Sequence, residues 1–271
     1  MTEDAIIGKL RKNAPLIGDD CAVIPDGPRR DLLLTTDFSI EAVHFTRRMK
    51  AEEIGYRAVA RSLSDIAAMG GKPLYCLVSI ALAPWTDARW IDRFYKGVYK
   101  ILERSRTKLA GGDISHAKQF IADVMVCGSV SKGKALMRYG ARPGDLLYVS
   151  GPLGGWRHKR EIVPRFDIGP KLLGKATACM DISDGLALDL HRLCLASGVA
   201  AEIESVPLVK RATVAEALHD GEDYELLYTA PSGSRVPGIA IGTIRKGEPG
   251  VLRYRGKNLA PLGYDHLQQR S

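Results

Sequence analysis

Carboxylates carry most of the chemical potential of this sequence, and most of them stand beside glycine or serine at the ends of apolar runs. The set comprises Asp19, Asp20, Asp37, Asp65, Asp113, Asp181, Asp184, Glu222 and Asp223. An aspartate beside glycine commonly makes a turn or caps a helix, and this simpler explanation suits any one position. Taken together, carboxylates that follow apolar strands can converge on one cleft, where hard oxygen ligands suit Mg²⁺ and substrate phosphates. Several separate carboxylates predict several ions.

Asp65 is the most informative of these carboxylates, because it lies well inside a helical pattern that runs from Glu52 to Met69. Its neighbours Ile66 and Ala67 are apolar, so the helix is expected to be largely buried. A charge on a buried helix needs a partner or a metal ion. The position therefore predicts a metal ligand more strongly than the turn-like positions do.

Familiar nucleotide and nucleophile motifs are absent, including G-x-G-x-x-G, H-E-x-x-H and G-x-S-x-G. Residues 169–176 are one residue short of a phosphate-binding Walker A loop, and Ala176 stands where that loop requires serine or threonine. We interpret this similarity as a coincidence. Among six scattered histidines, His44 lies just past Asp37 and is a candidate site residue.

The elements that must position these residues alternate between strand-like and helix-like runs, which predicts a mixed α/β (α+β) protein. Helices are expected at 52–69, after Thr86 as the N-terminal cap, and from Gly185 to a stop at Gly198. Strands are expected at 32–37, 74–83, 121–130, 146–150, 199–204, 225–230 and 239–244.

A turn cluster at 141–145 predicts a domain boundary, which divides the chain into residues 1–140 and 141–271. The stretch 151–169 is rich in glycine, proline and charge, and it is expected to be a connecting loop.

Composition places the chain among folded proteins of a reducing compartment. Its 271 residues are 45% hydrophobic and 26% charged, which excludes a disordered chain. The longest apolar run, 74–84, is too short to span a bilayer, and the first four residues do not begin a signal peptide. Five cysteines without a C-x-x-C pair predict neither disulfides nor a zinc ribbon. A cytoplasmic protein without a membrane partner is expected.

The charge balance of 39 basic against 31 acidic residues gives a net charge of +8. Basic residues are scattered, with the densest spots at 29–30, 47–48 and 159–160, and no basic stripe interleaves with aromatic residues. A phosphorylated small molecule would use this charge as well as a nucleic acid would. We therefore expect a phosphate-bearing small molecule and no nucleic acid.

The order of motifs along nearly the whole chain resembles the thiamine-monophosphate kinases, a family of the aminoimidazole-ribonucleotide-synthetase-like superfamily. The stretches that carry the resemblance are Gly18-Asp19-Asp20-Cys21-Ala22, Thr35-Thr36-Asp37, Glu41-Ala42-Val43-His44-Phe45, Leu63-Ser64-Asp65-Ile66-Ala67-Ala68-Met69-Gly70, Gly111-Gly112-Asp113, Asp181-Ile182-Ser183-Asp184-Gly185, Gly221-Glu222-Asp223-Tyr224-Glu225-Leu226 and Gly263-Tyr264-Asp265-His266. The resemblance implies two α/β domains and a homodimer whose N-terminal sheets pair into a barrel. The N-terminal domain would bind ATP and Mg²⁺, and the C-terminal domain would be a shortened α/β domain. The activity implied is ATP-dependent phosphorylation of thiamine monophosphate to thiamine diphosphate.

The resemblance also implies roles for individual residues. Several Mg²⁺ ions would be held by Asp20, Thr35, Thr36, Asp37, Asp65, Asp113, Asp181 and Asp184. ATP would contact Gly112, Asp113, Arg138, Ser183 and Tyr95, and the thiamine substrate would face His44 and Glu222. The guanidinium of Arg138 could hold phosphate oxygens in a bidentate manner.

No catalytic base is expected, because phosphoryl transfer depends mainly on positioning and charge neutralisation. The acceptor is itself a phosphate with a second pKa of about 6, so it is largely deprotonated at neutral pH. Direct in-line transfer without a phosphorylated enzyme is the expected mechanism.

The chain departs from the family pattern at residues 114–117, at Ser62 and Asp220, and at Pro261, where an aromatic residue that packs on the substrate is often found. A helix of the second domain is also expected to be missing between Gly155 and Pro164. Two alternatives follow: a relative with another acceptor, or a nucleotide-binding protein without activity. Cys21 lies inside the metal motif, which argues against a selenophosphate-forming relative. The retained carboxylates argue against the inactive protein, because unused buried charges are costly.

Overall fold

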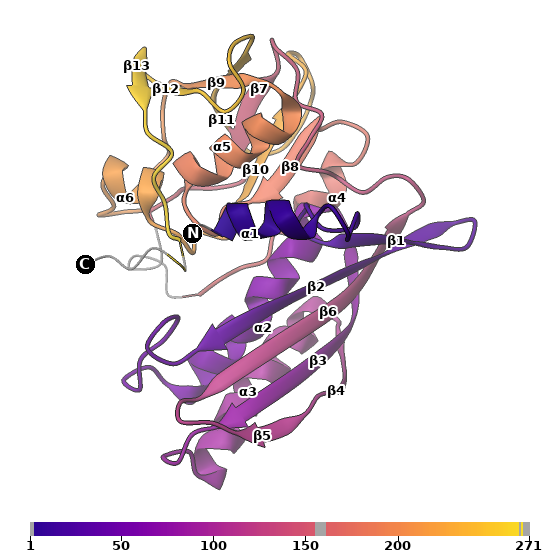
Figure 1. The fold of residues 1–271 in the computed structure, drawn as a ribbon, viewed down its shortest axis with the longest axis vertical. Helices are drawn as coiled ribbons and strands as arrows, with labels where there is room; N and C mark the ends of the chain where they lie inside the picture. The colour runs from indigo at the N-terminus through magenta and orange to yellow at the C-terminus, as the bar shows by residue number, and fades with distance from the viewer. Residues whose placement is uncertain (1–2, 155–160, 266, 268–271) are drawn as a thin grey trace.

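The computed structural model describes residues 3–154, 161–265 and 267, which form two mixed β-sheets with helices packed against them (Figure 1). The first sheet has the strand order β1-β2-β6-β3-β4. Strand β5 also pairs with β3, along a later stretch of β3 than the one that pairs with β4. The second has the order β13-β12-β9-β11-β7-β10-β8. The expected mixed α/β class is confirmed.

The first sheet is built around three long strands. Its members are β1 (Ala22–Asp26), β2 (Arg30–Ile40), β3 (Lys72–Leu82), β4 (Lys108–Gly111), β5 (Ile114–His116) and β6 (Ile121–Ser131). Strand β6 pairs with both β2 and β3 in antiparallel register, with Asp37 opposite Val124 and Val124 opposite Val78. Side chains alternate between faces, and those of Leu33, Val78 and Val124 are buried on one face.

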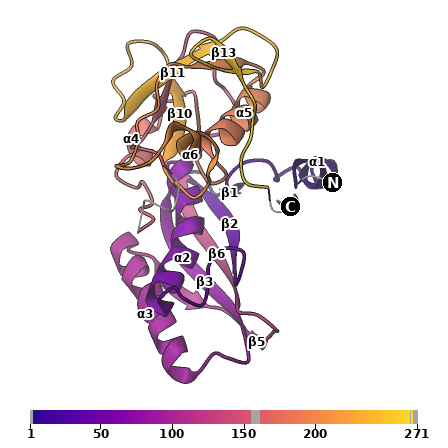
Figure 2. The ribbon, with the colours of Figure 1, turned by 90° about the vertical axis from the view of Figure 1, so that its left-hand side faces the viewer.

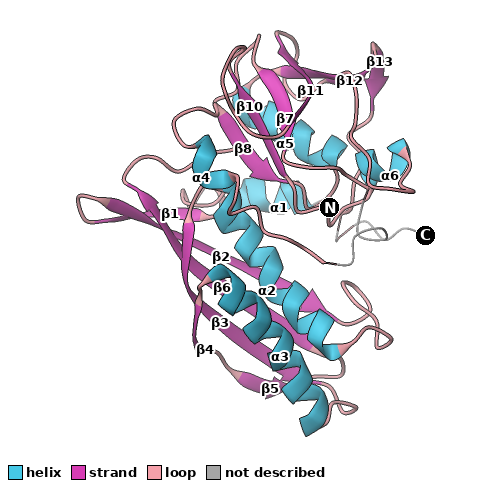
Figure 3. Ribbon diagram, turned by 180° about the vertical axis from the view of Figure 1, so that it is seen from behind, coloured by secondary structure: helices cyan, strands magenta, loops and turns pink. Residues whose placement is uncertain are grey.

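Two helices cover that face, α2 (Ala51–Ala68) and α3 (Ala88–Ser105) (Figure 3). They pack unusually closely, because a Cβ atom at Gly97 would lie 1.9 Å from the backbone oxygen of Glu52. The expected helix at 52–69 is confirmed as α2. The expected cap of α3 is wrong: Asp87 accepts the hydrogen bond from the Trp90 backbone N–H, while the Thr86 hydroxyl donates to Ala83.

The opposite face of this sheet carries no helix among the described residues, as Figure 1 shows. Apolar side chains are exposed there, with Phe38 57% and Tyr75 50% accessible. The sheet is open in the single chain. The expected barrel would form across two copies and stays a prediction.

The second sheet is made of shorter strands. These are β7 (Leu146–Val149), β8 (Ala178–Asp181), β9 (Ala200–Ile203), β10 (Leu226–Ala230), β11 (Ile239–Arg245), β12 (Leu252–Tyr254) and β13 (Lys257–Leu259). Strands were expected near β7, β9, β10 and β11, and these are confirmed; the short β8, β12 and β13 were not predicted. Helix α5 (Leu186–Ser197) follows Gly185 and ends at Gly198, whose φ of 69° is left-handed, as expected.

The remaining helices are short: α1 (Glu3–Leu10), α4 (Gly169–Leu172) and α6 (Val214–His219). Gly169 opens a helix of one turn, and a Cβ atom there would lie 2.1 Å from the Ala67 backbone oxygen. The glycine thus serves close packing on α2. The expected loss of a helix between Gly155 and Pro164 falls on a stretch whose residues 155–160 lie outside the described residues.

The C-terminal end of α2 joins the two sheets. Ala68 belongs to a buried cluster with Leu136, Leu172 and Tyr228, residues that flank or form the second sheet. Figure 2 shows α2 rising from the first sheet to the base of the second. No helix in the described part of the chain is long and apolar enough to cross a membrane.

Candidate active site

Helix α2 presents a row of three charged residues to the junction of the two sheets. Arg57, Arg61 and Asp65 are four residues apart, so they share one face of the helix. Arg57 and Arg61 both donate to the carboxylate of Glu222, and Asp65 accepts a hydrogen bond from the Thr35 hydroxyl. One helix therefore orders both ends of the site.

Four carboxylates gather at the Asp65 end of this row: Asp20, Asp37, Asp65 and Asp181, of which the structure places each near others of the set. Burial raises the pKa of Asp65 and of Asp181 well above 3.8, and repulsion between the carboxylates raises both further. Burial likewise raises the pKa of Asp20 and of Asp37. Such a set is poorly neutralised without a bound cation.

The oxygen atoms of this cluster suit Mg²⁺. Oδ2 of Asp20 and Oδ2 of Asp37 are buried and have no hydrogen-bond partner among the described residues. Within the described ranges, no three acidic, histidine or cysteine side chains are already arranged around one point. Mg²⁺ typically takes one or two carboxylates and completes its shell with water and substrate phosphates. The free oxygens are therefore suitable for ions that arrive with a phosphate.

Arg138 lies beside this cluster and is paired with acidic residues. Its backbone N–H donates to the Asp19 carboxylate, at 3.0 Å to Oδ2, and its Nη2 donates to Oδ1 of Asp20 at 2.5 Å. Burial and the nearby Asp20 raise the pKa of Asp19 to about 7. The arginine expected on ATP is thus already next to the expected metal ligands.

The turn that carries Asp181, Ser183 and Asp184 is fixed by a residue that the sequence did not single out. Oδ2 of the buried Asp189 accepts hydrogen bonds from the backbone N–H groups of Ser183, Asp184 and Gly185 at 3.0–3.2 Å. Its position in the first turn of α5, four residues after Gly185, was the available signal. The Asp181 side chain is held separately, by the hydroxyl of Ser64 at 2.6 Å.

A pocket of about 720 Å³, here called the central pocket, opens next to the carboxylates. It is lined by the end of β2, the turn at 42–46, Arg61, and the segments around Asp184 and Glu222. Six residues predicted for the site line it: Thr36, Asp37, His44, Ser183, Asp184 and Glu222. The predicted substrate residues and part of the predicted metal set therefore meet in one cavity.

Two of these predicted residues have their polar atoms partly engaged. The Thr36 hydroxyl donates to Oδ1 of Asp123 at 2.5 Å, so Thr36 is engaged on the helix-free face of the sheet. Thr35, on the helix face, points to Asp65 instead. Nδ1 of His44 accepts from the Ile40 backbone N–H at 2.9 Å, which fixes the ring at the pocket wall.

Glu222 has a strained backbone conformation, and two arginines hold its side chain in position. Its φ of 66° is left-handed, which is uncommon for glutamate. The backbone of Glu222 is bonded to that of Ser183, because the Glu222 N–H donates to the Ser183 carbonyl at 2.7 Å. Arg57 and Arg61, both about 5% exposed, clamp the two carboxylate oxygens. Sequence analysis missed both arginines.

Tyr264 supplies an aromatic side chain to the central pocket. Its backbone N–H donates to the Asp184 carbonyl at 2.9 Å. Only glycine fits before it, because a Cβ atom at Gly263 would lie 2.6 Å from the Asp184 backbone oxygen. The sequence pointed to Pro261 as the place of a missing aromatic, and the structure puts an aromatic ring into the pocket from three residues further on.

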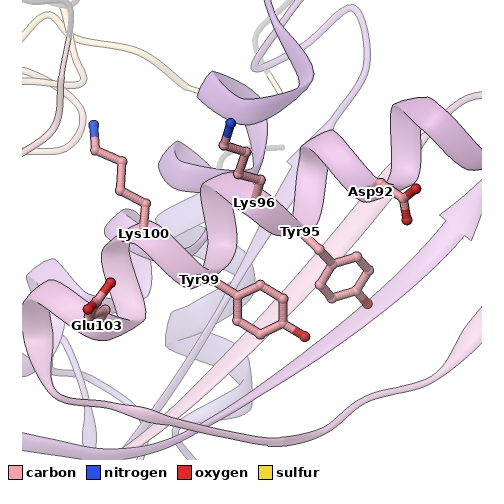
Figure 4. A pocket seen from close by; sticks show the side chains of 6 residues that line it. All are labelled: Asp92, Tyr95, Lys96, Tyr99, Lys100 and Glu103. Atoms are coloured by element: carbon pink, nitrogen blue, oxygen red, sulfur yellow. The ribbon is translucent and has the colours of Figure 1, made fainter.

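Three predicted residues lie elsewhere. Gly112 and Asp113 are exposed at the β4–β5 edge, where a Cβ atom at Gly112 would meet the Val78 backbone oxygen. Tyr95 lies on α3 in a separate shallow pocket of about 640 Å³ with Tyr99, and the two ring centroids are 6.2 Å apart (Figure 4). Within one chain these residues are not brought to the carboxylates.

Comparison with known proteins gives consistent matches. The model of the family described as AIR synthase related protein, N-terminal domain, matches residues 18–130. A thiamine-monophosphate kinase of Aquifex aeolicus is 33% identical over 98% of this chain and 98% of its own length. The same enzyme of Haemophilus influenzae is 34% identical, over 79% of this chain and 75% of its length.

Solved structures agree with these matches. The structure described as AaThiL complexed with AMPPCP and TMP superposes with a TM-score of 0.92 at 31% identity, covering 98% of this chain and 97% of that one. The hydrogenase maturation protein HypE shares the fold alone, with a TM-score of 0.75 at 17% identity.

Proposed function

The chain belongs to the thiamine-monophosphate kinase family, and from this premise we propose that it transfers a phosphoryl group from ATP to thiamine monophosphate, giving thiamine diphosphate and ADP. The step belongs to thiamine diphosphate biosynthesis. A relative of the same architecture has been solved with AMPPCP and TMP, which are the pair of ligands that this reaction requires as ATP analogue and acceptor.

The observation that carries this proposal is that the central pocket opens next to the buried carboxylates. Thiamine monophosphate has a cationic ring system at one end and a phosphate at the other. Glu222, His44 and Tyr264 supply a carboxylate, an imidazole and an aromatic ring to the pocket. Asp37 and Asp184 line the same pocket and lead to the metal-type carboxylates. The pocket therefore offers groups suited to both ends of the acceptor.

The residues that would hold Mg²⁺ are Asp20, Asp37, Asp65 and Asp181, with the hydroxyl groups of Thr35 and Thr36, Asp184 and Asp113 as further ligands. When bound, Mg²⁺ neutralises the charge on the phosphates and on the transferred group. The protein's own contribution is to keep these carboxylates together: Thr35 and Ser64 orient two of them by hydrogen bonds.

Transfer is direct and in line, without a general base. The acceptor phosphate, with a second pKa of about 6, already presents an anionic oxygen at neutral pH. Arg138 and Ser183 would orient the ATP phosphates; charge-assisted hydrogen bonds from the Arg138 guanidinium are short and directional. The pocket's role is to place the acceptor for attack.

We assign the remaining ATP residues to a site shared between two copies of the chain. Asp37 pairs with Val124, Val124 with Val78, and Gly112 lies against Val78. Neighbouring strands are about 4.8 Å apart, so Asp113 lies roughly 14 Å from Asp37 in the same chain. Gly112, Asp113 and Tyr95 of a second copy would complete the site. Phe38 and Tyr75 on the helix-free face of the first sheet provide the apolar surface for a homodimer.

The chain is proposed to work in the cytoplasm, in keeping with its five free cysteines. We propose the division at 140/141 as the domain boundary, with the first sheet on one side and the second sheet on the other.

The test is a reaction with Mg-ATP, with and without thiamine monophosphate, in which products are identified by mass. ADP that forms only with the acceptor, together with thiamine diphosphate, is the expected result. ATP binding with no change in thiamine monophosphate would mean another acceptor or an inactive protein. Radiolabelled γ-phosphate that stays on the protein without acceptor would exclude direct transfer.

A further inference from the structure

Arg61 occupies a position between the two ends of the central pocket. It is the middle member of the Arg57–Arg61–Asp65 row, so Glu222 lies to one side of it and the buried carboxylates to the other. Its guanidinium interacts electrostatically with both Glu222 and Asp37. Arg61 lines the central pocket, whereas Arg57 is not among the residues that line it.

The hydrogen-bonding capacity of Arg61 is only partly used. Its Nη2 donates to Glu222, while its Nε is buried without a hydrogen-bond partner among the described residues. The side chain is 6% exposed. A buried guanidinium with donors to spare favours binding of an anion that enters the pocket.

The local charge count favours an anion as well. Arg57 and Arg61 share the single carboxylate of Glu222, which leaves one positive charge in excess. In the ligand-free protein Asp37 offsets part of this excess. When Asp37 is engaged by a cation, that compensation is lost, and a phosphate beside Arg61 restores it.

We propose that Arg61 is a specificity-determining residue whose guanidinium binds a phosphate oxygen of the acceptor. This inference rests on the proposed function. If the ring system lies near Glu222 and the phosphoryl group is transferred near Asp37, the acceptor phosphate lies between them. Arg61 is positioned there to contact it. The pocket thereby accepts a phosphomonoester and discriminates against the corresponding alcohol.

The experiment compares binding of thiamine monophosphate and of unphosphorylated thiamine to the full-length protein by calorimetry, with MgCl₂ and a non-hydrolysable ATP analogue present. The variants are Arg61→Met, Arg61→Lys and the matched control Arg57→Met, which also removes one partner of Glu222. Thermal unfolding of each variant establishes that it is folded.

In Arg61→Met, the affinity for thiamine monophosphate is expected to fall roughly 10- to 100-fold more than the affinity for thiamine, as for loss of a charge-assisted hydrogen bond. Arg61→Lys should recover part of the difference. Arg57→Met should weaken both ligands alike, because it acts only through Glu222.

An unchanged ratio of the two affinities in Arg61→Met would overturn the inference, as would an equal fall of that ratio in Arg57→Met. A wild-type protein that binds neither ligand would instead overturn the proposed function. If Arg61→Met does not fold, Arg61→Lys decides: its ratio must fall while that of Arg57→Lys does not.

Discussion

Arg138 donates a hydrogen bond from Nη2 to Oδ1 of Asp20 at 2.5 Å, so the arginine expected on ATP is paired with a carboxylate expected on a metal ion. The pair is well protected, with side chains 22% and 4% exposed. In the ligand-free protein each group compensates the other. If the proposed roles hold, binding of Mg-ATP would replace this contact by one from Asp20 to the cation and one from Arg138 to phosphate.

Replacing Arg138 by methionine should therefore affect stability and ATP binding together. The metal-free protein should lose about 3 kcal/mol of unfolding free energy, since a buried charge on Asp20 is left without its partner. The KM for ATP should rise roughly tenfold or more. Steady-state kinetics and urea unfolding measure the two effects, and Arg138→Lys should be intermediate in both. An unaltered KM for ATP would remove Arg138 from the nucleotide site.

Asp65→Asn should strongly reduce turnover while preserving the fold. The change removes a carboxylate at the centre of the metal set, and loss of one such electrostatic group typically costs roughly 10²- to 10³-fold in kcat. In EDTA the variant should unfold at a temperature equal to or above that of the wild type, because one buried like charge is gone. Asp26→Asn, a surface change on β1, is the matched control. Near-normal activity in Asp65→Asn would show that Asp65 is outside the site.

The metal-free protein should become less stable as pH rises from about 4 to 7. Burial raises the pKa of Asp19 to about 7 in the folded state, against about 3.9 for an unfolded chain. The folded state therefore holds a proton that the unfolded state releases across this window, and stability falls with pH. The pKa of Asp31 and that of Glu41 are lowered instead, so their contribution changes only below this window.

Unfolding temperatures in EDTA at pH 5.5 and pH 8 measure this effect, with the higher value expected at pH 5.5. Addition of MgCl₂ at pH 8 should raise the unfolding temperature, because the cation binds the folded state only. The protons displaced by the metal should make its affinity increase with pH. A metal-free protein that is more stable at pH 8 would contradict the buried carboxylate cluster.

Complementation between two inactive variants would test the shared site. Asp37→Asn and Asp113→Asn should each be inactive as homodimers. If Asp37 of one copy works with Asp113 of the other, a mixed dimer contains one intact site and one doubly altered site. Mixing equal amounts after subunit exchange should then recover about a quarter of wild-type activity, since half the dimers are mixed. No recovery in verified mixed dimers, or a wild-type monomer by light scattering at micromolar concentration, would contradict the proposal.

Much of the fold could be predicted because the long elements have strong patterns. Helix α2 and strands β2, β3 and β6 were expected within a few residues, and Gly198 ends α5 as predicted. The N-terminal cap of α3 was assigned to Thr86 instead of Asp87, since both are good caps and only tertiary context separates them. Short strands such as β4 and β8 escaped prediction, because four residues carry too little periodicity.

The site was predictable where a residue type contradicted its surroundings. Asp65 on an apolar helix was such a case, and the structure buries it among other carboxylates. Arg57 and Arg61 lie on the same helix and the same face as Asp65, so their charges carried the same signal, but neither was predicted as a site residue. Their partner Glu222 is more than 160 residues away in sequence, and only the packing of the two sheets brings it to α2. Tyr264 was missed for the same reason, since its contact with Asp184 is also distant in sequence. Asp189 is different, because its partners lie four to six residues away and its local signal was not used.

The row of Arg57, Arg61 and Asp65 on α2 also determines which insertions and deletions this protein can tolerate. Four residues advance a helix by about 6 Å and return to the same face, so the spacing between Arg61 and Asp65 is set by the helix itself. A single inserted residue there would rotate one from the other by about 100°. Substitutions along α2 can thus be absorbed one at a time, whereas an insertion or deletion between these two residues would separate the acceptor from the metal ions in a single step.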